Sequence, residues 1–355
     1  MEMELKIIEA KNKKAKPAGA LGFGKYFTDH MFVMEYGDGE WRNARIQPYE
    51  PFSLDPSTAV FHYAQAIFEG TKAYKNKEGE IRLFRPRENF LRLNNSADRV
   101  CIPPVDVDFV LDALSKLVLM EKDWIPSDEG TALYIRPSII ATDSALGVHA
   151  AHNYIFFIIL SPVGAYYAHG LEPVGLYVEQ EYVRASKGGT GHHKVAGNYA
   201  ASLKAGEKAI QMGYDQVMWL DSKEHKYVEE VGSMNIFFVL GGKVVTPMLG
   251  GSILPGITRK SVIELLKSEG MEVEERLVPI KEVIDGIKDG TCTEIFGTGT
   301  AAVISPVGKV GYEGKDYIVG GGKMGEISRF TYDRVTGIQT GKIEDKFGWV
   351  TRIDR

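Results

Sequence analysis

The chain has 355 residues, with 42 lysines and arginines against 47 aspartates and glutamates, so its formal charge is -5. That length exceeds one ordinary domain and fits two. The near balance of charge argues against nucleic acid or an anionic membrane surface as a partner. The longest apolar run, residues 154–160, is too short to cross a membrane. Two cysteines far apart in sequence, behind no signal-like start, favour a reduced, cytoplasmic protein.

Strand and helix patterns follow one another from the N-terminus. Lysines crowd residues 11–16, which we expect to form a mobile basic segment. Strand patterns fall at residues 32–36, 81–84, 131–140 and 154–160, and helical patterns at 87–100 and 109–120. The sequence therefore predicts an α+β domain over residues 1–163 and a linker at 164–173. A second domain, over residues 174–355, alternates strands with helices.

One lysine in the second domain is placed for covalent chemistry. Lys194 follows the glycine-rich residues 187–193 and precedes what reads as the start of a helix. A lysine amine can act as a nucleophile when a shaped site holds it, and a loop-to-helix junction can do so. Because most lysines that follow glycines are solvated loop residues, this motif alone does not assign chemistry.

A second segment supplies an acidic group. Residues 229–235 read as a connection between strands at 216–221 and 236–240, whose side chains can point into a cleft. Glu230 could then face a buried cationic partner.

Two further segments are suited to binding an anion. An apolar stripe that ends at Gly270 predicts a helix with Thr258 as its N-cap. The free backbone amides at that helix start, with the positive end of the helix dipole, form a phosphate seat. Residues 297–301 place small side chains where backbone amides can approach an anion closely.

These motifs, in this order, resemble those of the branched-chain amino acid aminotransferases, which are class IV pyridoxal phosphate enzymes of fold type IV. The resemblance covers nearly the whole chain, from residues 61–70 through Tyr134-Ile-Arg-Pro137 to residues 344–349. It implies a two-domain, D-amino acid aminotransferase-like fold with pyridoxal 5'-phosphate in a cleft between a small N-terminal α/β domain and a larger C-terminal domain. It also implies a homodimer in which Tyr63 crosses the subunit boundary.

The resemblance assigns roles around the cofactor ring. Lys194 would form the Schiff base with pyridoxal phosphate and then move the substrate's α-proton. Tyr199 would hydrogen-bond the ring hydroxyl; taken alone, it would read as a core residue of a helix. Glu230 would pair with the ring nitrogen. Its neighbour Glu229 is then expected to be a surface charge, because adjacent residues on an extended segment point in opposite directions.

Phosphate binding is assigned by the same resemblance. The matching positions are Arg92, Ile257, Thr258 and Thr300. An arginine suits phosphate because its planar fork donates two hydrogen bonds together. Outside this context, Arg92 would be an ordinary cation on a helix surface.

Substrate binding has to serve an apolar branched side chain and, in the second half-reaction, the side-chain carboxylate of glutamate. The resemblance implies that the backbone amides of Thr300 and Ala301 and the hydroxyl of Tyr134 hold the α-carboxylate. Arg136 would approach the distal carboxylate, although alone it would read as a buried ion-pair partner on a strand. The walls would be aromatic side chains, which pack methyl groups and, as tyrosines, can also donate hydrogen bonds: Tyr63, Phe68 and Tyr166.

The chain departs from the family in two places. Some mammalian members carry a Cys-x-x-Cys redox pair where this chain has Ala302 and Ser305, so that thiol switch cannot operate here. His192 and His193 stand directly before Lys194, where many relatives have an acidic or small residue. We expect them to form ordinary loop hydrogen bonds, and no histidine pattern predicts a metal site.

The expected activity is transfer of the amino group of L-leucine, L-isoleucine or L-valine to 2-oxoglutarate. Three alternatives remain open at this stage. A D-amino acid aminotransferase or an aminodeoxychorismate lyase would share Lys194 and Glu230, although the residues after Arg136 lack the Arg-x-His pair of the D-specific enzymes. A non-catalytic protein that binds a phosphate ligand would use Lys194 only as a cation. The choice among the three branched substrates turns on one methylene, about 1 to 3 kcal/mol, and is not readable from sequence.

Overall fold

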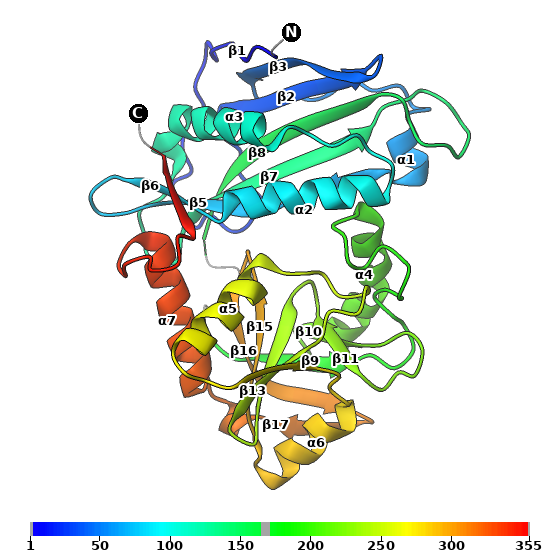
Figure 1. Cartoon of the computed structure of the whole chain (residues 1–355), viewed down its shortest axis with the longest axis vertical. Helices are drawn as coiled ribbons and strands as arrows, with labels where there is room; N and C mark the ends of the chain where they lie inside the picture. Colours follow the sequence, from blue (N-terminus) through cyan, green and yellow to red (C-terminus); the bar gives the residue numbers. More distant parts are fainter. Residues whose placement is uncertain (1–2, 165–170, 354–355) are drawn as a thin grey trace. The chain divides into compact units, whose positions relative to one another are not determined.

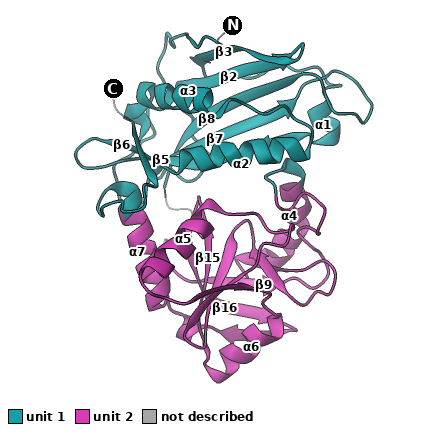
Figure 2. Ribbon diagram, viewed as in Figure 1, with its two compact units in different colours: residues 1–166, 193–197, 338–355 teal, residues 167–192, 198–337 magenta. Residues whose placement is uncertain are grey.

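The computed structural model describes residues 3–164 and 171–353, and it divides the chain into two compact units (Figures 1 and 2). Unit 1 comprises residues 1–166, 193–197 and 338–355, and unit 2 comprises residues 167–192 and 198–337.

Two segments lie in unit 1 although the sequence placed them in the second domain. The C-terminal strand β18 (Val350–Ile353) pairs antiparallel with β6 (Ile81–Phe84). Just before it, the Trp349 carbonyl accepts a hydrogen bond from the Arg85 amide at 2.7 Å. The other segment is residues 193–197, which contain Lys194. It belongs to unit 1, where Val195 forms a β-bridge with Ile67. Long-range strand pairing of this kind leaves no local pattern in the sequence.

Unit 1 is built on one mixed sheet. Its strands run in the order β1-β3-β2-β8-β7-β5-β6-β18, and β4 also pairs with β7. The remaining strands are β1 (Lys6–Ile7), β2 (His30–Gly37), β3 (Glu40–Pro48), β4 (Ala66–Phe68), β5 (Thr71–Lys75), β7 (Ala132–Ala141) and β8 (Tyr154–Val163). The helices are α1 (Ala59–Tyr63), α2 (Pro86–Arg99) and α3 (Val107–Met120), followed by a short 3-10 turn, Lys122–Trp124.

The core of unit 1 lies between α2, α3 and one face of this sheet (Figure 1). Leu133, Ile135 and Ile139 of β7 belong to that core. Because side chains alternate along a strand, the intervening Tyr134 and Arg136 lie on the opposite face. Burial of one face thus reserves the other face for polar and aromatic side chains.

Unit 2 contains a second mixed sheet, in the order β11-β10-β9-β16-β15-β12-β13-β14, with β17 paired to β16. Its strands are β9 (Val174–Val178), β10 (Gln216–Leu220), β11 (Val228–Val231), β12 (Asn235–Leu240), β13 (Lys243–Pro247), β14 (Val273–Arg276), β15 (Cys292–Gly299), β16 (Val303–Tyr312) and β17 (Lys315–Ile318). The helices are α4 (Ala196–Gln211), α5 (Ile257–Ser268), α6 (Ile280–Asp289) and α7 (Glu326–Thr340), with a 3-10 turn at Gly320–Gly322; the ends of α4 and α7 extend into unit 1.

The strands and helices predicted from sequence are all present, and their ends differ from the prediction by at most three residues. Two local predictions are wrong. Residues 228–231 form strand β11, paired antiparallel with β10, where the sequence suggested a connection. Lys14, expected in a mobile segment, is held in place: its amide donates to Asp29 Oδ1 at 2.7 Å and its Nζ to the Thr28 carbonyl at 2.8 Å. Among the described residues, no helix is long and apolar enough to cross a membrane.

Candidate active site

Lys194 lies where the sequence predicted it, two residues before α4. Its backbone is fixed on both sides within unit 1. The amide donates to Ser96 Oγ on α2 at 3.0 Å, and the carbonyl accepts from the Phe68 amide at 3.1 Å. The side-chain Nζ lies 4.6 Å from the centre of the Phe68 ring. The amine is therefore carried by a backbone that two structural elements hold in register.

A buried carboxylate lies near this lysine. Glu69 is fully buried, and Asn89 Nδ2 donates to its Oε2 at 2.8 Å. Although burial opposes ionisation, the charges of Arg92 and Lys194 and these hydrogen bonds hold the pKa of Glu69 below its usual range. Glu69 is therefore ionised at neutral pH.

Arg92, predicted to bind phosphate, has Glu69 as its partner. Its Nε and Nη2 donate to the two oxygens of that carboxylate at 2.7 and 2.9 Å. The arginine is buried on α2, so the alternative reading as a surface cation is wrong. The fork that suits phosphate is occupied by a carboxylate, and the phosphate role stays a prediction.

Three predicted substrate residues meet on one part of unit 1. Arg136 Nη2 donates to the Tyr134 hydroxyl at 3.1 Å, and the Arg136 guanidinium lies 4.7 Å from the centre of the Phe68 ring. Arg136 Nε is buried without a hydrogen-bond partner among the described residues. A Cβ on Gly70 would lie 2.1 Å from the Tyr134 hydroxyl oxygen, so only glycine leaves room for this ring. The group offers an unused donor to an anion.

The glycine-rich loop before Lys194 is closed on itself. Thr190 Oγ1 donates to Asn198 Oδ1 at 2.6 Å, and Asn198 Nδ2 donates to the Thr190 carbonyl at 2.9 Å. The His192 imidazole hydrogen-bonds the Ile253 carbonyl through Nδ1 at 3.0 Å. His192 is thus the ordinary loop residue that the sequence predicted.

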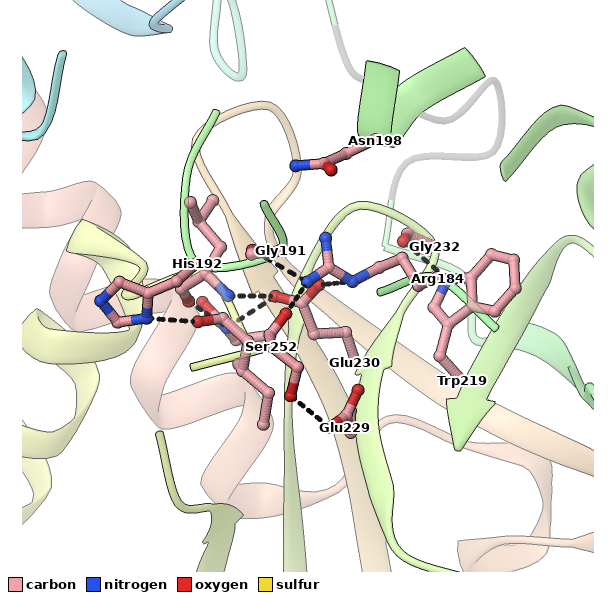
Figure 3. A network of polar contacts seen from close by, with 12 residues as sticks. Arg184, Gly191, His192, Asn198, Trp219, Glu229, Glu230, Gly232 and Ser252 are labelled. Carbon is pink, nitrogen blue, oxygen red and sulfur yellow. Dashed lines mark hydrogen bonds and ion pairs between the residues drawn. The ribbon is translucent and has the colours of Figure 1, made fainter. Parts of the chain in front are cut away.

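Glu230 is a buried carboxylate of β11. Its Oε1 accepts from the Leu254 amide at 3.0 Å and from Asn235 Nδ2 at 3.3 Å, while Oε2 forms an ion pair with Arg184 Nε (Figure 3). Leu254 lies just before α5. The predicted ring-nitrogen partner is therefore fastened to the segment that leads into the predicted phosphate seat.

That phosphate seat differs in one detail from its prediction. The N-cap of α5 is Gly256, with φ -67° and ψ 134°, so Thr258 is the second helical residue and its assignment as N-cap is wrong. No side chain caps this helix start. Because glycine offers no oxygen, the first amides, on Ile257 and Thr258, are directed at whatever anion approaches. The predicted C-terminal stop is confirmed, since Gly270 follows the helix with φ +79°.

The second segment predicted to bind an anion includes the turn between β15 and β16. Gly299 pairs with Val303, so Thr300 and Ala301 lie in the connecting turn. Gly297 and Gly299 pack against Met234, whose side-chain atoms lie 3.0 and 3.2 Å from where a Cβ would be. A larger residue at either glycine would require the Met234 side chain to shift.

Glu229 is the clearest error of the sequence analysis. It is buried rather than a surface charge, and Ser252 Oγ donates to its Oε1. The cause is an irregular register: Trp219 pairs with Glu230 but Leu220 pairs with Val228, which leaves Glu229 as an extra residue on β11. Such a bulge re-aims side chains and relaxes the strict alternation of a strand.

The remaining predicted residues include three tyrosines. Tyr63, on α1, is 40% exposed, and Tyr199 is partly buried on α4. Tyr166 lies outside the described residues.

The two free cysteines differ: Cys101 is exposed, whereas burial raises the pKa of Cys292 to about 12. Among the described residues, no cluster of histidine, cysteine, aspartate or glutamate could hold a metal ion.

The sequence analysis missed Arg184 and Lys72, two cations whose partners are predicted site residues. Arg184 is the partner of Glu230, and the prediction that Glu230 faces a buried cation could have prompted a search for it. Lys72, on β5, pairs in register with Tyr134 on β7. Burial lowers the pKa of Lys72 to about 8. Neither belongs to a motif, so only the strand pairing and loop packing reveal them.

The comparisons with known proteins match this arrangement. The family model for amino-transferase class IV matches residues 66–310. Branched-chain-amino-acid transaminase 1 of Bacillus subtilis is 54% identical over 354 residues, 98% of this chain and 99% of that protein.

Two solved structures share the fold. The branched-chain amino acid aminotransferase of Escherichia coli, at 29% identity, has a TM-score of 0.76 and covers 92% of this chain and 99% of its own. That of Thermobaculum terrenum, in its PLP form, has 26% identity, a TM-score of 0.74 and coverage of 91% and 98%. This chain therefore belongs to the class IV aminotransferase family, with the fold type IV architecture. Within that family, the relatives named above are branched-chain amino acid aminotransferases.

Proposed function

We propose that this protein is a branched-chain amino acid transaminase that uses pyridoxal 5'-phosphate, with L-leucine, L-isoleucine or L-valine as amino donors and 2-oxoglutarate as acceptor. The observation that carries this proposal is the hydrogen bond from the Leu254 amide to Glu230 Oε1, at 3.0 Å. It places a buried carboxylate beside the entrance of α5, so that one ligand with a cationic ring and a phosphate could meet both.

The residues of unit 2 fit this cofactor. Glu230 offers a buried acceptor, and the uncapped start of α5 offers free amides. When bound, the cofactor supplies a protonated ring that accepts electron density as the substrate's α-proton leaves. Glu230 would keep that ring protonated, Tyr199 would donate to the ring hydroxyl, and the amides of Ile257, Thr258 and Thr300 would hold the phosphate.

The amine of Lys194 is the proposed base. It would anchor the cofactor at rest. Once the substrate's amine displaces it, the freed amine would take the substrate's α-proton and deliver it to the cofactor's aldehyde carbon. Its backbone hydrogen bonds to Ser96 and Phe68 fix the position of the main chain that carries the amine.

Substrate recognition would divide between an apolar and a charged task. The amides of Thr300 and Ala301 with the Tyr134 hydroxyl would hold the α-carboxylate, and Arg136 would meet the distal carboxylate of glutamate through its unused Nε. Phe68, Tyr63 and Tyr166 would pack the branched side chain.

We also propose a cytoplasmic homodimer in which Tyr63 completes the partner's pocket. The exposure of Phe61 and Tyr63, 61% and 40%, supports burial of α1 by another subunit. Full activity from a monomeric species, seen by light scattering at assay concentration, would contradict it.

Arg92 remains in the proposal as a phosphate-binding arginine. Arg92→Lys keeps a charge beside Glu69 but loses the planar fork. Cofactor affinity should fall, and thermal stability should fall only in part, because lysine keeps a charge for Glu69 but not both of the hydrogen bonds that the arginine donates. An unchanged dissociation constant for pyridoxal phosphate would remove Arg92 from the site and leave it as the partner of Glu69.

The function itself is tested by spectroscopy and turnover together. Wild-type protein with pyridoxal phosphate should show a visible band that borohydride abolishes, and Lys194→Ala should never show it. The band should then change with L-leucine, L-isoleucine, L-valine and L-glutamate and not with their D-forms. A protein that stays colourless would contradict the enzyme reading, and a response to D-leucine alone would favour a D-amino acid aminotransferase.

A further inference from the structure

Arg184 joins three separate segments of unit 2. Its Nε forms an ion pair with Glu230 Oε2, and its Nη2 donates to the carbonyls of Gly191 and Ser252 (Figure 3). The side chain is 9% exposed and that of Glu230 is 3% exposed. A charge as deeply buried as Glu230 stays ionised when a cation and hydrogen bonds compensate for lost water.

The two carbonyls belong to loops with defined tasks. Gly191 lies in the glycine-rich approach to Lys194, and Ser252 lies in the loop that leads to α5. The loops touch there: a Cβ on Gly191 would lie 2.2 Å from the Ser252 carbonyl oxygen. Arg184 therefore fastens both loops at a point where their backbones meet.

The same loop residue also reaches the neighbouring carboxylate. Ser252 uses its carbonyl for Arg184 and its hydroxyl for Glu229. The bulge on β11 makes this possible, because it leaves both Glu229 and Glu230 buried. Arg184 also acts electrostatically on Glu229. One guanidinium thus lies among two buried acids and two loops.

We propose that Arg184 is a positioning residue that keeps Glu230 ionised and aimed at the cofactor's ring nitrogen, while it holds the loops on either side of the cofactor site in register. This inference rests on the proposed function, since it requires Glu230 to face the ring. Without the guanidinium, Glu230 would lose the cation that pairs with its Oε2, and its carboxylate would take up a proton more readily instead of holding one on the ring.

Two variants separate charge from geometry. Arg184→Gln removes the charge and keeps a hydrogen-bond donor, whereas Arg184→Lys keeps the charge and loses the fork. Arg276→Gln is the matched control, because Arg276 also joins acidic side chains, Glu274 and Glu282, to a backbone carbonyl, that of Leu277. It lies in unit 2, outside the residues proposed to bind the cofactor.

The measurement is the nitrogen-15 chemical shift of ring-labelled pyridoxal phosphate bound to each protein, with its dissociation constant. Wild type, Arg276→Gln and Arg184→Lys should give the shift of a protonated ring nitrogen. Arg184→Gln should give that of an unprotonated nitrogen, as should Glu230→Gln. Both Arg184 variants should bind the cofactor about tenfold more weakly, the change that ~1.4 kcal/mol produces.

The outcomes distinguish this inference from the function on which it rests. Absence of a bound signal in the wild type would overturn the proposed function and this inference together. A bound wild type with a protonated-nitrogen shift in Arg184→Gln would overturn the role of Arg184 alone. If Arg184→Gln does not fold, Arg184→Lys provides the test. An Arg184→Lys protein that binds pyridoxal phosphate with wild-type affinity would overturn the inference. Weaker binding with an unchanged nitrogen-15 shift would support it.

Discussion

Both oxygens of the Glu69 carboxylate accept hydrogen bonds from Arg92 within unit 1, Oε1 from Nε at 2.7 Å and Oε2 from Nη2 at 2.9 Å. Removing one member of a buried ion pair leaves the other charge without compensation. Glu69→Gln should therefore lower the free energy of unfolding by roughly 3 to 5 kcal/mol. Urea unfolding followed by circular dichroism measures this loss.

The control for Glu69→Gln is an exposed pair in the same unit. Arg87 and Asp108 form an ion pair with side chains 56% and 79% exposed. Solvent screens such a pair, so Asp108→Asn should leave stability unchanged within error. Equal effects of the two substitutions would contradict the structural role assigned to Glu69.

Arg136 is predicted to separate the two substrates. Its Nε has no hydrogen-bond partner among the described residues, so a distal carboxylate can bind there. Arg136→Met should raise the KM for L-glutamate by about tenfold or more, the effect of one lost charge-assisted hydrogen bond. The KM for L-leucine, which has no distal charge, should change by less than about threefold. Equal changes for both amino acids would assign Arg136 to the α-carboxylate or to structure.

Gly256 is predicted to be irreplaceable for cofactor binding. Its φ of -67° suits any residue, but a Cβ there would lie 2.0 Å from Asn235 Oδ1. Displacing Asn235 would loosen its hydrogen bonds to the Leu254 carbonyl and to Glu230. Gly256→Ala should weaken pyridoxal phosphate binding about tenfold, as measured by fluorescence titration. Gly250→Ala is the matched control, because it lies in the same loop and its Cβ would meet nothing within 4 Å; identical affinities would refute the prediction.

Sequence patterns predicted the elements of both units because burial of one face imposes a regular spacing. The strand at residues 81–84 and the helix stop at Gly270 were recovered in this way. The placement of β18 beside β6 was not, since pairing of strands far apart in sequence leaves no periodic trace.

Errors at the site had specific physical causes. Alternation along a strand placed Glu229 on the surface, but an extra residue in the pairing with β10 turned it inward. Thr258 has the chemistry of an N-cap, yet the chain caps α5 with Gly256, where a side chain would strike Asn235. Arg184 was not predicted because it belongs to no motif, and its partners lie on segments that are distant in sequence.

Glu229 gives the chain a pH-dependent contribution to stability. Burial raises the pKa of Glu229 above its usual 4.5, and the hydrogen bond from Ser252 and the charge of Arg184 oppose the shift without cancelling it. The folded protein therefore keeps this proton at pH values where the unfolded chain has released it. The contribution of Glu229 to wild-type stability should decline as pH rises from 4.5 towards the raised pKa and then level off.

Glu229→Gln should remove that decline, because glutamine stays neutral and its carbonyl can still accept from Ser252. The difference in unfolding free energy, variant minus wild type, should grow in favour of the variant over the same pH range, as measured by urea unfolding from about pH 4 to about pH 9. Glu207→Gln, an exposed substitution on α4, controls for the loss of one carboxyl group and should give a flat difference. If the difference in unfolding free energy for Glu229→Gln stays constant with pH, Glu229 contributes through packing. The folded protein would then tolerate a neutral and an ionised carboxyl equally at this position of β11.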